Sequence, residues 1–166
     1  GSLLSIISKM VSPQHILEIG TFTGYSAIAL VQGLSAHGKL TTIEYNPEHA
    51  AIAERFFHQS AYAAQIDLLV GDAKSILADM NESFDLVFID ADKEAYAQYF
   101  DLIIDKCTPG AIIIVDNVLW SGKVIHAIKD KKTQIIHEFN QKIAADPRVE
   151  NVILPIRDGI TLIRKR

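Results

Sequence analysis

The sequence lacks the features of a membrane or disulfide-bonded protein: its 166 residues include one cysteine and no long apolar run. A single cysteine, Cys107, excludes an intramolecular disulfide and is typical of proteins kept in a reducing cytoplasm. No apolar run reaches the roughly 18 residues that cross a bilayer, so we expect no membrane partner. The net charge of −4 provides no global attraction for nucleic acid.

The chain also lacks low-complexity tracts, internal repeats and linkers rich in Pro and Gly, so residues 1–166 are predicted to form a single domain. The hydrophobic content of 49% is sufficient for a sizeable core without disulfides. The six histidines show no spacing typical of metal ligands, and we interpret them as surface or packing residues.

Short apolar runs alternate with helical segments along most of the chain. Strands are predicted at residues 15–19, 39–43, 66–70, 84–89, 111–115, 149–154 and 160–164. Helices are predicted over residues 3–11, 25–34, 47–59, 73–80, 94–105 and 133–145, with a loop over 121–132. This alternation predicts an α/β fold with a doubly wound, mostly parallel sheet. The last two strands, joined by a Pro- and Gly-containing turn, are expected to form an antiparallel hairpin.

Two aspartates end two neighbouring apolar strands, Asp90 after the run 84–89 and Asp116 after the run 111–115. Continuous runs rich in Val and Ile are typical of strands buried on both faces of a parallel sheet. Because segment 94–105 is long enough for a right-handed crossover, the two strands are expected side by side, about 4.8 Å apart. Both carboxylates would then emerge at the carboxyl edge of the sheet, where open α/β folds bind ligands.

Two carboxylates this close repel each other unless a cation or a proton lies between them. With the amide oxygen of Asn117 beside them, three hard oxygen donors converge, which is a ligand set that Mg²⁺ or Ca²⁺ prefers. The alternative interpretation is that Asp90 and Asp116 only cap the helices that follow them.

The first strand–helix junction, Glu18-Ile-Gly20-Thr-Phe-Thr-Gly24, has G-x-x-x-G where a dinucleotide site would have G-x-G-x-x-G. The carboxylate before it would repel a pyrophosphate but could hold an ammonium group. Glu44 ends the second strand, where a carboxylate can accept both hydroxyls of a ribose. Asp72 ends the third and could accept a hydrogen bond from an adenine amino group. An amine, a ribose and an adenine without phosphates describe S-adenosylmethionine better than NAD, although each residue alone could be a turn glycine or a helix cap.

Several segments carry a resemblance to a known family: LEIGTFTGYSAIAL, TTIEYN, VGDA, FDLVFIDADK and IIIVDNVLWSGKV. They resemble the cation-dependent class I O-methyltransferases, the group of catechol and caffeoyl-coenzyme A O-methyltransferases and their bacterial relatives. The similarity continues through the terminal LPIRDGITLIRK, and DADK followed by DNVLWSG is its most specific part. It implies a Rossmann-like sheet of seven strands with the last antiparallel. It also implies a homodimer and an N-terminal helical segment that this chain would lack.

The resemblance implies roles for individual residues. Lys93 would be the catalytic base, because its ammonium form is disfavoured beside a cation. The ligands of Mg²⁺, or of another divalent cation, would be Asp90, Asp116 and Asn117. The residues lining S-adenosylmethionine would be Glu18, Gly20, Tyr25, Ser26, Glu44, Asp72, Ala73 and Asp90.

The implied function is Mg-dependent transfer of a methyl group from S-adenosylmethionine to a phenolic, catechol-like hydroxyl of a small molecule. Trp120 could wall an aromatic acceptor or belong to the core, and Asp158 is a weaker substrate-side candidate. The alternatives are O-methylation of a hydroxyuridine in tRNA, an NAD-type nucleotide-binding domain, and a non-catalytic cofactor-binding module. The negative net charge argues against RNA, and the missing G-x-G-x-x-G argues against NAD.

Overall fold

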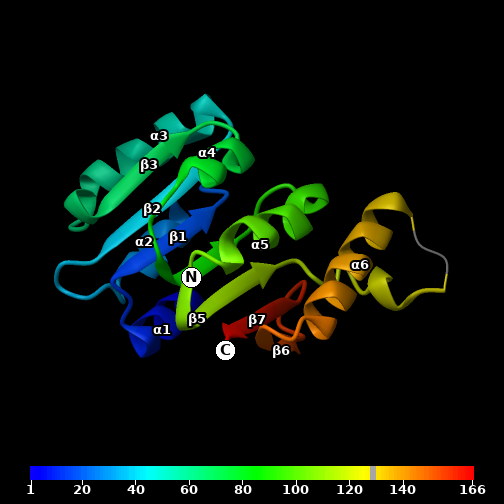
Figure 1. The fold of residues 1–166 in the computed structure, drawn as a ribbon. Helices are drawn as coiled ribbons and strands as arrows, with labels where there is room; N and C mark the ends of the chain where they lie inside the picture. The colour runs from blue at the N-terminus through cyan, green and yellow to red at the C-terminus, as the bar shows by residue number, and fades with distance from the viewer. Residues whose placement is uncertain (128–129) are drawn as a thin grey trace.

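Seven strands form one sheet through the centre of the computed structural model, which describes residues 1–127 and 130–166 (Figure 1). The strands are β1 (His15–Ile19), β2 (Lys39–Glu44), β3 (Ile66–Val70), β4 (Phe84–Ile89), β5 (Cys107–Asp116), β6 (Val149–Leu154) and β7 (Ile160–Lys165). Their order across the sheet is β3-β2-β1-β4-β5-β7-β6. Strands β1 to β5 are parallel, and β7 runs antiparallel to both β5 and β6. The predicted fold class, including the C-terminal hairpin, is confirmed.

Helices cover both faces of the sheet (Figure 1). They are α1 (Ser2–Val11), α2 (Tyr25–Val31), α3 (Pro47–Gln59), α4 (Ala73–Asp79), α5 (Tyr96–Ile104) and α6 (Lys131–Ala145), with 3₁₀ turns η1 (Ala63–Gln65), η2 (Lys93–Ala95) and η3 (Lys123–Ile125). Helices α1, α2 and α3 pack on one face, and α4, α5 and α6 on the other. Within the described ranges, no helix is long and apolar enough to cross a membrane.

The fifth strand is the one whose predicted start is wrong by several residues. It begins at Cys107 and not at residue 111. Pro109 and Gly110 lie in an irregular stretch of the strand. There the pairing jumps from Cys107 opposite Phe84 to Ile112 opposite Leu86. Proline and glycine therefore interrupt the ladder without ending the strand.

Two helix starts also differ from prediction. The segment predicted as a helix from residue 94 opens as the 3₁₀ turn η2, and α5 proper begins at Tyr96. Helix α6 begins at Lys131 because Asp130 caps it, accepting the Thr133 N–H at 2.9 Å. Residues 128–129 of the predicted loop 121–132 lie outside the described residues.

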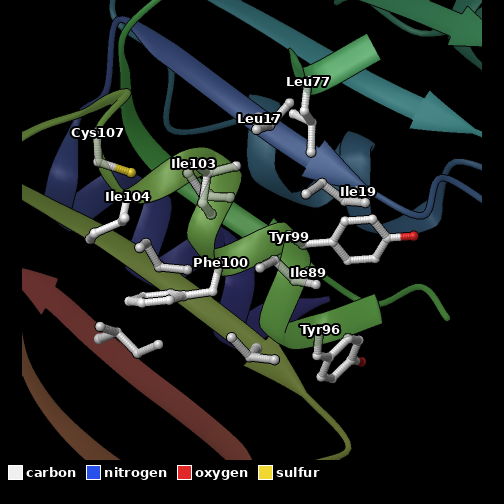
Figure 2. Packing of buried hydrophobic residues seen from close by; sticks show 14 of the residues in the cluster. Leu17, Ile19, Leu77, Ile89, Tyr96, Tyr99, Phe100, Ile103, Ile104 and Cys107 are labelled. Carbon is white, nitrogen blue, oxygen red and sulfur yellow. The ribbon is translucent and has the colours of Figure 1, made fainter. Parts of the chain in front are cut away.

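Side chains of each central strand alternate between two apolar clusters. Leu17 and Ile19 of β1 belong to the cluster under α4, α5 and α6, whereas Ile16 faces α1, α2 and α3. Figure 2 shows Phe100 and Ile103 of α5 packed over the strands of the first cluster. Because both faces are buried, a one-residue slip of β1 would exchange its side chains between the two clusters and misplace Gly20, which follows the strand.

Gly20 lies where β1 and β4 diverge, which is the point at which the strand order reverses. Its φ of 99° is in the left-handed region, and a Cβ built there would overlap the carbonyl oxygen of Asp90. The backbone joins the two loops to the strands: Gly20 N–H donates to Ile43 O at 3.0 Å, and Asp90 N–H donates to Ile19 O at 3.0 Å. Glycine is therefore required for the two loops to touch.

We expect Gly20→Ala to lower the free energy of unfolding by about 2–3 kcal/mol. The new methyl group would overlap the backbone of Asp90, and alanine is also unfavourable at this φ. The matched control is Gly122→Ala, at φ 75° with nothing within 4 Å of the added carbon, for which about 1 kcal/mol is expected. Urea unfolding of both variants makes the comparison. Equal losses would show that the contact with Asp90 imposes no constraint.

Candidate functional site

A cavity of about 810 Å³ opens at the carboxyl ends of β1, β2, β3 and β4. Residues predicted to contact the cofactor form much of its lining: Gly20, Glu44, Asp72, Ala73 and Asp90. They lie at the carboxyl ends of four different strands. These ends share one edge of the sheet because the strands are parallel and in register. A cavity of this size at a topological switch point is typical of a small-molecule site.

Glu44 is held by backbone groups at the end of β2. Its Oε2 accepts the Phe22 N–H at 2.7 Å and its Oε1 accepts the Asn46 N–H at 2.9 Å. His49 Nδ1 lies 3.7 Å from the same Oε1. Each carboxylate oxygen can accept a further hydrogen bond, so Glu44 is oriented and still able to bind two hydroxyl groups of a ligand.

Asp72 fits both interpretations made from the sequence. It caps α4, accepting the Lys74 N–H at 3.4 Å and the Ser75 hydroxyl at 3.1 Å, and it also lines the cavity. Ala73, the next residue, opens the helix and is buried. A helix cap at a strand end therefore does not exclude a role in ligand binding.

Aromatic side chains complete the lining, and the sequence analysis missed them: Phe22, Tyr45, His49 and Tyr99. The rings of Phe22 and His49 meet edge to face with centroids 4.8 Å apart. Tyr45 could have been found, because it directly follows Glu44 at a strand end. In Figure 2 the hydroxyl of Tyr99 points away from the apolar cluster, towards the strand ends. Nothing local to the sequence brings the first turn and α3 together.

Glu18 does not line the cavity. It is fully buried in β1, and its Oε2 accepts the Thr42 hydroxyl at 2.5 Å, which in turn contacts the Thr21 hydroxyl at 2.5 Å. Its Oε1 has no hydrogen-bond partner within the described part of the chain, although the Ser26 hydroxyl is close enough to favour the ionised form. Burial raises the pKa of Glu18 to about 7. The Glu18 carboxyl group is thus linked through Thr42 to Thr21 of the first turn.

Tyr25 is also placed outside the cavity. Its side chain is 72% exposed and lines a separate groove with Gly1 and residues of α1. Ser26 is half-buried at the start of α2, on the Glu18 side of the first turn. The cofactor contacts predicted for Glu18, Tyr25 and Ser26 therefore stay predictions.

Lys93 is directed at Asp90. Its Nζ donates to Asp90 Oδ1 at 2.7 Å and lies 5.2 Å from the centroid of the Tyr96 ring. The Lys93 side chain is 18% exposed, which is unusual for a surface lysine. The 3₁₀ turn η2 positions it, and Asp92 caps that turn through the Glu94 N–H at 3.2 Å.

Asp90 and Asp116 lie at neighbouring strand ends, because Ile89 of β4 pairs with Val115 of β5. Burial, and to a smaller extent repulsion from Asp90, raises the pKa of Asp116. The Asn117 N–H, which donates to Asp116 Oδ1 at 2.7 Å, acts in the opposite direction and lowers it. Of the residues described, no three His, Cys, Asp or Glu side chains are grouped to hold a metal. A cation here would need the Asn117 amide as its third ligand, and this all-oxygen set fits Mg²⁺.

The two substrate-side candidates, Trp120 and Asp158, lie in or against residues 117–122, which follow Asp116. Trp120 is half-buried with a φ of 49°, three residues after Asn117. Asp158 lies in the β6–β7 turn, where its side chain accepts the Ser121 N–H and its carbonyl oxygen accepts the Leu119 N–H at 2.9 Å. Asp158 therefore accepts two backbone N–H groups, one of them through a carboxylate oxygen.

Comparison with known proteins gives a consistent result. The family model described as O-methyltransferase matches residues 1–166. Caffeoyl-CoA O-methyltransferase 2 of Petunia hybrida is 35% identical, over 99% of this chain and 74% of the relative. The catechol O-methyltransferase of Niastella koreensis is also 35% identical, over 93% of this chain and 72% of the relative.

The fold is likewise shared with solved structures. The O-methyltransferase of Bacillus cereus, solved in complex with SAH, superposes with a TM-score of 0.92 at 33% identity. That match covers 99% of this chain and 80% of the solved chain.

The buried Glu18 predicts a pH dependence of stability. Its pKa is about 7 when folded, against 4.5 for an exposed glutamate, so the folded state retains a proton that the unfolded state releases. Stability should therefore fall as pH rises from about 4.5 to 7, by about 3 kcal/mol in total, and level off above that range. Glu18→Gln should remove this fall and be more stable than the parent at pH 8.

Urea unfolding at pH 5 and pH 8 measures the effect, with Glu150→Gln on the exposed edge strand as the matched control. An identical pH dependence in Glu18→Gln and the parent protein would show that Glu18 is ionised when folded.

Proposed function

Because the chain belongs to the O-methyltransferase family, we propose that it methylates a phenolic, catechol-like hydroxyl of a small molecule with the help of Mg²⁺ or another divalent cation. The enzyme is an S-adenosylmethionine-dependent O-methyltransferase. The observation that supports the proposed acceptor and cation is the position of Asp90. It lines the cavity and also lies beside Asp116, so the cofactor site and the oxygen-donor site adjoin.

The cavity has the groups that S-adenosylmethionine requires. This cofactor supplies a methyl group on a positively charged sulfur, so an acidic edge favours its binding. Glu44 is oriented to accept its ribose hydroxyls, and Asp72 can accept from its adenine amino group. Tyr45 and Tyr99 add apolar surface for the base and the ribose.

Asp90, Asp116 and Asn117 would hold the cation. A divalent cation makes a phenolic hydroxyl, with a pKa of about 10, easier to ionise and fixes its position. Two vicinal hydroxyls offer two oxygens to one ion, which is the reason for proposing a catechol-like acceptor. The raised pKa of Asp116 is consistent with this role, because an added positive charge would relieve its repulsion from Asp90.

Lys93 would accept the phenolic proton at Nζ. Its ammonium group now pairs with Asp90, and a cation bound at that carboxylate would compete with this pair and favour the neutral amine. The Tyr96 ring below it limits the directions in which the side chain can turn. In the proposed reaction, Lys93 would exchange its contact with the Asp90 carboxylate for one with the acceptor hydroxyl.

The names of the relatives favour a small phenol over RNA as the acceptor. One is named for caffeoyl-CoA and the other for catechol, and both of those compounds carry vicinal hydroxyls. The net charge of −4 also disfavours a polyanionic substrate.

A screen for transfer of a labelled methyl group tests the proposal, with catechol, a caffeoyl thioester, a monophenol and tRNA as acceptors. We expect transfer to the two catechol-type acceptors, loss with a chelator, and recovery with Mg²⁺. Asp116→Ala should abolish turnover and leave cofactor affinity within about twofold, because Asp116 does not line the cavity. Full activity in excess chelator would contradict the cation assignment, and transfer to tRNA alone would contradict the acceptor.

Substitution of Lys93 tests the proton acceptor. Lys93→Ala should lower kcat about 10²–10⁴-fold, with a smaller loss for an acidic acceptor such as a nitrocatechol. Lys93→Arg should not restore activity, because a guanidinium stays protonated. The control is Lys74→Ala, which removes a lysine that lines the cavity and makes no ion pair with Asp90. The same loss for acceptors of very different acidity would assign Lys93 an electrostatic role.

A further inference from the structure

We propose that Asn140 and Asp158 are positioning residues that hold segment 117–122 in a strained conformation and so preform the cation site. The segment follows Asp116 directly and includes Asn117, the third ligand of the proposed site. The cation belongs to the proposed function, on which this inference rests. The contacts that Asn140 and Asp158 make with the segment do not depend on the cation.

The strain is concentrated in this segment. Asn117, Trp120 and Ser121 have φ values of 61°, 49° and 55°, in the left-handed region, and Gly122 follows at 75°. Each non-glycine residue in that region costs roughly 1 kcal/mol or more. Such a run persists only where its surroundings determine it, so the contacts that hold the segment have to be strong.

The β6–β7 turn clamps the segment from one side. Asp158 accepts two of its N–H groups, from Leu119 through the backbone oxygen at 2.9 Å and from Ser121 through the carboxylate. Gly159 O accepts a third, from Val118 at 3.2 Å. A Cβ on Gly159 would overlap the Leu119 side chain, so the turn and the segment are packed against each other.

Helix α6 clamps the segment from the other side. Asn140 Nδ2 donates to Val118 O at 2.8 Å, and Asn140 Oδ1 is buried without a partner in the parts of the chain described. An unpaired amide oxygen is unfavourable when it is buried. Asn140 therefore stabilises the segment through the hydrogen bond that its Nδ2 donates. Phe139, the preceding residue, contacts the Tyr96 ring, whose hydroxyl donates to Asp116 O at 2.9 Å.

The two clamps explain how Asp116, at the end of β5, and Asn117, at the start of the segment, can be presented together. Asp116 ends a strand, and the left-handed turn at Asn117 sets the direction of the following amide. If the segment relaxed to ordinary φ values, the Asn117 side chain would leave that position. Preorganised ligands bind more tightly because the ordering is complete before the ion arrives.

This inference gives Asp158 a different role from that of a charged substrate-side group, and Asp158→Asn distinguishes the two. An asparagine oxygen still accepts the Ser121 N–H, so a positioning role survives the change and a role through charge does not. Asp158→Ala removes the carboxylate that accepts the Ser121 N–H and keeps the backbone oxygen that accepts the Leu119 N–H. For Asn140, the matched pair is Asn140→Ala with Asn151→Ala, because Asn151 Nδ2 makes the same kind of bond, to Ile143 O at 3.1 Å, on the distant edge strand.

The first measurement is amide hydrogen exchange on the cation-free protein. The amide of Ser121 in Asp158→Ala, and the amides of Leu119 and Ser121 in Asn140→Ala, should exchange about three- to tenfold faster, the worth of one hydrogen bond. They should be unchanged in Asp158→Asn and Asn151→Ala. Should Asn140→Ala not fold, Asn140→Asp keeps the shape of the side chain, removes the donor and is expected to behave in the same way.

The second measurement is Mn²⁺ affinity, by electron paramagnetic resonance of the free ion. Asn140→Ala and Asp158→Ala should bind Mn²⁺ about three- to tenfold more weakly, with an unchanged KM for S-adenosylmethionine. Asp158→Asn should stay within about twofold of the parent, because its oxygen still accepts the Ser121 N–H.

Unchanged exchange and affinity in both alanine variants would overturn the inference. Asp158→Asn with slow exchange but lost activity would overturn it for Asp158. A parent protein that binds no Mn²⁺ would instead refute the cation of the proposed function, and hydrogen exchange would still decide the positioning role.

Discussion

The parallel pairing of β4 with β1 on one side and with β5 on the other is the constraint on which the site depends. Ile19 pairs with Ile89, and Ile89 pairs with Val115. The residues that follow are therefore brought to one edge in register. For this reason Asp90 lines the cavity and also lies beside Asp116. Its backbone is in close contact with Gly20, which lines the cavity as well.

The acidic groups at this edge are accommodated in different ways. Backbone N–H groups donate hydrogen bonds to Glu44, Lys93 forms an ion pair with Asp90, and burial raises the pKa of Glu18 to about 7. The ionisation of Asp116 is opposed by burial and by the neighbouring Asp90 carboxylate. This concentration of negative charge suits the sulfonium of S-adenosylmethionine, and the divalent cation of the proposed function would relieve the repulsion between Asp90 and Asp116.

Much of the site was readable from single strands and the residues that follow them. Continuous apolar runs indicated the central strands, and Gly20, Glu44, Asp72 and Asp90 were predicted to line the ligand site from their places at strand ends. All of these line the cavity. Glu18 was also placed by its spacing, but spacing does not report which face of β1 a side chain occupies. It lies on the α1–α3 face, in contact with Thr42, and not at the cavity.

The sequence by itself determined the order of strands and helices, the acidic strand ends and the resemblance to cation-dependent O-methyltransferases, because each is a local pattern. Only the tertiary structure decided which distant segments meet. It brought His49 of α3 against Phe22 of the first turn, and Asn140 and Asp158 against the segment after Asp116. Such contacts depend on how helices and turns pack across the sheet, and side chains far apart in sequence carry no local periodicity that would reveal them.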